Sequence, residues 1–158
     1  GSEICIRDSD YSAEFVTEGR LEPNGYSLLL MTEPGSQHGL GVFMLSEFFR
    51  RAGWNVTLAN PTDMSDFKRS FQSDWFDAVG LSLATDRHLT EIQQTLPELL
   101  AGSVNSALQV FVGGPMASLA PDTVTWPKTV LLEGNAIEAV EKVTQTLFNM
   151  ERQISQTL

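Results

Sequence analysis

A short apolar segment that leads into a glycine-rich loop and then into a helical pattern most constrains how this chain folds. Tyr26–Thr32 is apolar at most positions, which is typical of a strand buried on both faces. The loop Glu33–Gly41 contains three glycines and His38, and Leu40–Ala52 then repeats its apolar residues at helical spacing. A buried strand followed at once by a helix predicts a parallel sheet covered by helices.

The alternation of strand and helix continues along the chain. Four further strands are predicted, at Trp54–Ala59, Asp77–Leu83, Leu108–Val112 and Thr129–Leu132. Further helices are predicted at Met64–Ser73, at roughly Arg87–Ala101 and from about Ala136 to Met150 or beyond, with Asn135 as N-cap of the last. This pattern predicts an α/β fold, a doubly wound five-stranded parallel sheet with the flavodoxin-like (Rossmann-like) strand order 2-1-3-4-5.

The predicted strand order brings three unusual loops to one edge of the sheet. Ligands of open α/β sheets bind outside the carboxyl ends of the strands, where the strand order reverses. That point lies between the first and third strands, whose loops carry His38 and Ser82–Thr85, and Gly113-Gly114 follows the neighbouring fourth strand. Because imidazole is a common metal ligand, we predict a cofactor site at this edge.

Composition and charge favour one globular domain that does not bind nucleic acid. The 158 residues suffice for a sizeable core, and 42% of them are hydrophobic. The net charge is −10 with scattered basic residues, whereas contact with phosphates needs clustered Lys and Arg. No segment approaches the roughly 20 apolar residues that span a bilayer. The single cysteine, Cys5, fits a reducing compartment, so we expect a cytoplasmic protein without membrane contact.

The N-terminal part of the chain lacks a clear period. Residues 1–24 are polar and mixed, so we expect a linker or irregular lead-in there and the domain itself at residues 25–158. Gly1-Ser2, without an initiator methionine, is typical of the scar of a cleaved tag. The chain is therefore expected to be a piece of a longer protein, whose neighbouring domains are among its partners.

Other proteins of this architecture need residues that this sequence lacks. A receiver domain needs an acidic pair after the first strand, an Asp ending the third and a Lys after the fifth. The chain has a lone Glu33, Ser82-Leu83-Ala84 and Glu133-Gly134 at these places. A flavodoxin needs a phosphate-binding loop rich in hydroxyl groups. Thr32 and Ser36 are too few for such a loop, although FMN stays open as a ligand. No Walker loop, dinucleotide fingerprint or serine nucleophile elbow is present, so we assign no catalytic residue and expect no enzyme.

The three loops resemble the cobalamin-binding domain, over roughly residues 26–148. That family carries Asp-x-His-x-x-Gly after its first strand, matched here by Ser36–Gly41, with Ser-x-Leu and Gly-Gly after its third and fourth strands. The corresponding segments here are Ser82-Leu83-Ala84 and Gly113-Gly114, and Glu133–Val140 is similar to the start of the closing helix. The resemblance implies His38 as axial metal ligand and a cofactor site formed by Ser36, His38, Gly41, Ser82, Ala84, Gly113 and Gly114.

Two of these positions depart from the family pattern. Ser36 replaces the Asp that tunes the basicity of the imidazole, and Ala84 replaces the Leu beside the nucleotide tail. These changes resemble the SCHIC domain, a sensor containing haem instead of cobalamin, of AppA-type antirepressors in photosynthetic bacteria. The resemblance implies haem as the first expected cofactor and cobalamin as the second, a response to redox state, oxygen and light, and a PpsR-like transcriptional repressor as partner.

Plainer interpretations stay open beside this one. His38 could be a loop histidine without a ligand, Ser36 a cap, and Gly39 and Gly41 sites of close packing. His88 is expected on the solvated surface, and the three tryptophans in the core or an interface.

The alternative functions are a corrinoid carrier domain of a methyltransferase or mutase, and a ligand-free interaction scaffold. Since no lid over a tetrapyrrole is evident, we expect weak binding by the isolated domain.

Overall fold

The computed structural model describes residues 22–36, 39–119, 121–124, 126 and 128–157. Its centre is a five-stranded parallel sheet in the order β2-β1-β3-β4-β5. The strands are β1 (Ser27–Thr32), β2 (Asn55–Ala59), β3 (Ala78–Ser82), β4 (Gln109–Gly113) and β5 (Thr129–Leu131). The predicted fold class and strand order are confirmed, and every strand boundary lies within one residue of its predicted place.

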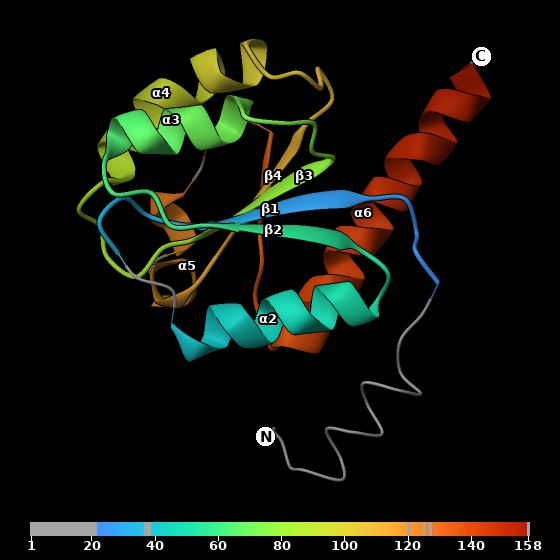
Figure 1. Ribbon diagram of the computed structural model, residues 1–158, viewed down its shortest axis with the longest axis horizontal. Coiled ribbons are helices and arrows are strands. Elements are labelled where there is room, and N and C mark those ends of the chain that lie inside the picture. Colours follow the sequence, from blue (N-terminus) through green and yellow to red (C-terminus); the bar gives the residue numbers. More distant parts are fainter. Residues whose placement is uncertain (1–21, 37–38, 120, 125, 127, 158) are drawn as a thin grey trace, which may run out of the picture.

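Helices cover both faces of the sheet (Figure 1). On one face lie α2 (Leu40–Arg51) and α6 (Ala136–Thr157), and on the other lie α3 (Met64–Gln72) and α4 (Leu89–Ala101). The C-terminal half of α6 projects beyond the sheet, and its residues 151–156 are all exposed. A short helix α5 (Pro115–Leu119) and a 3₁₀ turn (Pro121–Thr123) follow β4. The sequence pattern predicts neither of them, because Gly113-Gly114-Pro115 indicates only a break.

Two hydrophobic clusters, one on each face of the sheet, form the core. Along β1, Leu28 and Leu30 belong to the cluster under α2 and α6, whereas Leu29 and Met31 belong to the one under α3 and α4. This alternation follows from the two-residue period of a strand. Trp54 and Trp126 are buried as expected, whereas Trp75 is half exposed.

The start of the described chain is joined to the turn between α2 and β2. The amide of Asn24 donates to the carbonyl of Gly53 (3.0 Å). Gly53 ends α2 as predicted with a positive φ of 100°, and a Cβ at this position would collide with the carbonyl of Glu22. Residues 1–21, most of the predicted lead-in, lie outside the described residues.

The first turn of α6 is held by a capping box, which confirms the prediction that Asn135 is its N-cap. The amide of Glu138 donates to Asn135 Oδ1 (2.9 Å), and the amide of Asn135 donates to Glu138 Oε1 (3.0 Å).

Removal of this cap is expected to lower stability modestly. Asn135→Ala leaves the amide of Glu138 without its acceptor, which should reduce the free energy of unfolding by about 1 kcal/mol. Ser155→Ala, on the exposed end of the same helix, is the control and should change it by less than about 0.5 kcal/mol. Urea unfolding followed by circular dichroism measures both, and equal midpoints for the two variants would contradict the capping role.

Candidate cofactor site

The sheet places the ends of three strands side by side. In the register of the parallel ladders, Thr32 at the end of β1 lies beside Ser82 at the end of β3, and Ser82 lies beside Gly113 at the end of β4. Residues after a parallel strand emerge at the same edge as those after its neighbours. The three loops that the sequence singled out therefore begin next to one another.

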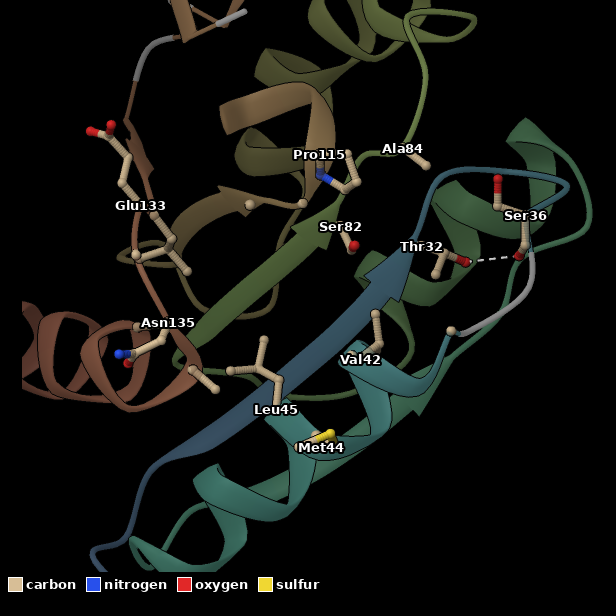
Figure 2. A pocket seen from close by; sticks show the side chains of 18 residues that line it. Thr32, Ser36, Val42, Met44, Leu45, Ser82, Ala84, Pro115, Glu133 and Asn135 are labelled. Atoms are coloured by element: carbon tan, nitrogen blue, oxygen red, sulfur yellow. Dashed lines mark hydrogen bonds between the residues drawn. The ribbon is translucent and has the colours of Figure 1, made fainter. Parts of the chain in front are cut away.

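These loops surround a cavity of about 570 Å³ (Figure 2). Such a volume lies within the usual range for pockets that hold small molecules, roughly 300–1,000 Å³. The wall includes the last residues of three strands, Thr32, Ser82 and Gly113, and the residues Ser36, Ala84 and Gly114 in the loops that follow them. The first turns of α2 and α6 form the sides of the cavity. The cavity therefore lies on the face of the sheet that these two helices cover.

Six of the seven predicted site residues line this one cavity: Ser36, Gly41, Ser82, Ala84, Gly113 and Gly114. The seventh, His38, lies outside the described residues together with Gln37, and so does its predicted bond to a metal. The structure thus brings together the described part of the predicted set. The contact of each residue with a cofactor stays a prediction.

The glycines of the cavity wall have two different structural roles. A Cβ added at Gly39 or Gly41 would meet no heavy atom of the described chain within 4 Å, so packing does not require glycine there. At Gly114, by contrast, φ is +96° and a Cβ would lie 2.8 Å from the carbonyl oxygen of Leu83. Gly39 and Gly41 therefore leave open space beside the cavity, whereas Gly114 is needed for the turn itself.

Sequence reasoning missed part of the wall. Leu132, Glu133, Gly134, Asn135, Ala136 and Ala139 contribute to it from the loop after β5 and the start of α6, and Gly39, Val42, Met44 and Leu45 from the start of α2 and the residue before it. The available signal was the strand order, because a fifth strand beside the fourth sends its loop to the same edge. Leu40 and Ile137, in the first turns of α2 and α6, are exposed apolar residues that are adjacent in sequence to residues of the wall.

A buried carboxylate behind the cavity was missed as well. Glu33 is 1% exposed, and its Oε1 accepts hydrogen bonds from the amides of Ala84 and Thr85, both at 2.9 Å. Its Oε2 accepts a third from the hydroxyl of Thr85 at 2.8 Å. Glu33 is conspicuous in the sequence only as an acid directly after a buried strand, and its partners lie 51 and 52 positions away.

The second histidine of the chain lies outside the cavity wall. His88 is the residue before α4, and its Nδ1 lies 3.7 Å from Glu91 Oε1. Its side chain is 25% exposed, so His88 is only partly solvated, whereas the sequence predicted a solvated surface residue. Within the described ranges, no group of three or more His, Cys, Asp or Glu is arranged to hold a metal ion. The described helices include none that is long and apolar enough to cross a membrane.

Comparisons with known proteins agree with this geometry. A family model for the B12 binding domain matches residues 26–143. An uncharacterized 20.5 kDa protein in the bchF-crtJ intergenic region of Rhodobacter capsulatus is 31% identical over 96 residues, which are 60% of this chain and 49% of that protein. This chain thus spans about half the length of that relative.

A solved structure has a similar fold. The crystal structure of a cobalamin-binding protein from Desulfitobacterium hafniense DCB-2 superposes with a TM-score of 0.61 at 20% identity, over 78% of this chain and 60% of that one. Its title refers to that protein alone, and at this identity the likeness concerns the fold. With the family model matched from β1 into α6, around the cavity described above, the chain belongs to the B12-binding domain family.

Proposed function

We propose that this chain binds cobalamin in the cavity at the carboxyl edge of its sheet. The observation that carries the proposal is the convergence of three motif-bearing loops on one cavity, with open space over Gly39 and Gly41. The family match adds that domains with this pattern are B12-binding domains. A cavity of about 570 Å³ would have room for the nucleotide tail of the cofactor.

The described residues fit this arrangement. The cavity wall includes the hydroxyl residues Ser36, after β1, and Ser82, at the end of β3, which suit the polar groups of a nucleotide. The hydroxyl of Thr32, by contrast, donates to the carbonyl of Ser36. The wall of α2 is apolar, with Val42 and Leu45. His38, which belongs to the loop between β1 and α2 and lies outside the described residues, would be the residue that holds the cobalt. Bound cobalt would supply a centre that responds to light and redox state.

Haem is the competing cofactor. The substitutions at Ser36 and Ala84 made haem the first expectation from the sequence, but the family match does not support haem and favours cobalamin. Haem iron also accepts an axial histidine, so both cofactors would use His38. The two therefore belong in the same binding experiment, where their absorption bands tell them apart.

We further propose a regulatory and non-catalytic role in the cytoplasm, within an antirepressor that responds to light and redox state and contacts a PpsR-like repressor. The resemblance of the loops to SCHIC domains supports this role. The relative named for the bchF-crtJ region is consistent with it. The net charge of −10 favours a protein partner over nucleic acid. The exposed Leu40 and Ile137, each adjacent in sequence to a residue of the wall, would offer apolar contacts to a lid from such a partner or a neighbouring domain.

The proposal is tested by titrating the purified chain with hydroxocobalamin and, separately, with hemin. We expect a saturable change in the cobalamin spectrum that His38→Ala abolishes. The control His88→Ala removes the other histidine, which lies outside the cavity wall, and should titrate like the wild type. A shift with hemin alone would replace cobalamin by haem, and no shift with either would identify a ligand-free scaffold.

A corrinoid carrier domain is the alternative within the same family. A carrier must present its bound cofactor to a separate catalytic domain, so it requires cobalamin bound through His38 just as the sensor does. An experiment in which the cobalamin complex is exposed to light distinguishes the sensor from the carrier. A change of axial ligation that alters binding to a repressor favours the sensor, whereas methyl transfer in the presence of a catalytic partner favours the carrier.

A further inference from the structure

We infer that Glu33 is a positioning residue, which fixes the β3–α4 loop at the wall of the cavity and couples it to the loop after β1. It takes no part in contact with a cofactor. This inference deepens the proposed function and rests on it only for the binding measurement below.

The end of β1 holds two walls of the cavity at once. Thr32 Oγ1 lies 3.0 Å from the carbonyl oxygen of Ser36, so it fixes the loop that follows β1. The next residue, Glu33, directs its carboxylate to the amides of Ala84 and Thr85. Ser36 and Ala84 both line the cavity. Two consecutive residues therefore set the separation of the β1–α2 and β3–α4 loops.

The contacts of Glu33 are unusually complete for an acid in a core. Its two oxygens accept from two successive backbone amides and one hydroxyl. Burial of a carboxylate is costly unless hydrogen bonds compensate for the lost water, and bonds to a charged group are stronger than neutral ones. Since Glu33 is 1% exposed, the energy of these bonds depends on Ala84 and Thr85 staying in place. Because Ala84 and Thr85 share this one buried acceptor, we expect this part of the loop to move together with Glu33.

Neighbouring bonds extend this coupling around the edge of the sheet. The carbonyl of Glu33 accepts from the amide of Ser36 (3.1 Å), and the amide of Gly35 donates to the carbonyl of Pro61 after β2 (3.0 Å). The β3–α4 loop leads into α4, on the face of the sheet opposite α2. A displacement of the loop after β1 would therefore reach α4 through Glu33.

Residue-resolved amide exchange of the ligand-free chain tests this inference without any cofactor. In Glu33→Ala the amides of Ala84 and Thr85 should exchange at least about tenfold faster, because each loses a charged acceptor. The amide of Val110 in β4 corrects for any change in global stability. Glu33→Gln keeps one oxygen that can accept both amides, so it should restore much of the protection. If Glu33→Ala does not fold, a smaller, local increase in Glu33→Gln alone still supports the inference.

The matched control is Glu47→Ala, which removes an exposed acid from α2 and the same unit of charge. Exchange at Ala84 and Thr85 should stay at wild-type rates in this variant. Unchanged exchange of these two amides in a folded Glu33 variant would overturn the inference.

Hydroxocobalamin binding gives the second readout. The dissociation constant should rise by about tenfold in Glu33→Ala, as expected for the loss of one preorganised wall, and should recover in Glu33→Gln. Wild-type affinity in a folded Glu33→Ala variant would overturn the positioning role. If the wild-type chain binds no hydroxocobalamin, the proposed function fails, while the exchange rates still decide whether Glu33 positions the loop.

Discussion

Gly114→Ala is expected to lower the free energy of unfolding by about 2–4 kcal/mol, a large share of the stability of a domain of this size. The residue has a φ of +96°, which an alanine adopts only with strain. The new Cβ would also lie 2.8 Å from the carbonyl oxygen and 2.9 Å from the amide nitrogen of Leu83. These backbone atoms cannot shift freely, because the amide of Leu83 donates a hydrogen bond to the carbonyl of Gly113 and its carbonyl accepts one from the amide of Met116.

The preceding glycine provides a matched control. A Cβ at Gly113 would lie 3.7 Å from the Cβ of Leu132, an ordinary van der Waals distance, and its φ is not positive. Gly113→Ala should therefore cost less than about 1 kcal/mol. Urea unfolding followed by tryptophan fluorescence compares the two variants. Equal stability of the two would show that the turn after β4 does not have the described conformation.

Gly41→Leu is expected to weaken cofactor binding by about 10- to 100-fold while the fold is retained. Gly41 lines the cavity within the first turn of α2, and no heavy atom of the described chain lies within 4 Å of a Cβ there. The leucine side chain would thus enter space that the proposed cofactor needs. Replacing glycine inside a helix should raise stability, by up to about 1 kcal/mol.

Gly41→Ala separates these two effects. It gives the same gain in helix stability but adds a single methyl group, so binding should weaken far less than in the leucine variant. Thermal unfolding measures stability, and titration with hydroxocobalamin measures binding. Full affinity in Gly41→Leu would exclude the cavity beside α2 as the cofactor site, whatever binds elsewhere.

The sequence was sufficient to predict the sheet and the edge that carries the site. Continuous apolar runs such as Ser27–Thr32 identify buried strands, and short connections through helices leave little choice but a parallel sheet. Once the order is known, a loop after each strand must emerge at the same edge. Ser36, Ser82 and Gly113 could therefore be assigned to one site although they lie far apart in the chain.

The missed features depend on contacts between distant residues. Helix α5 has five residues, too few for a period, and Pro115 begins it after a pair of glycines that indicates a break. The role of Glu33 depends on amides some 50 positions away, which no local pattern reveals. His88 was expected to be a solvated residue of a first helical turn, yet it stands just before α4 with a side chain that is 25% exposed.

Electron paramagnetic resonance of cob(II)alamin bound to the chain tests the central claim most directly. The nuclear spin of the nitrogen that binds cobalt splits the lines of this spectrum. A ¹⁴N nucleus gives triplets, and a ¹⁵N nucleus gives doublets. With ¹⁵N-histidine in the protein and unlabelled cofactor, we expect doublets, because His38 replaces the nucleotide base when the tail enters the cavity. His38→Ala should lose them. Triplets in the labelled protein would show that the base stays on cobalt, and would contradict binding of the tail between β1, β3 and α2.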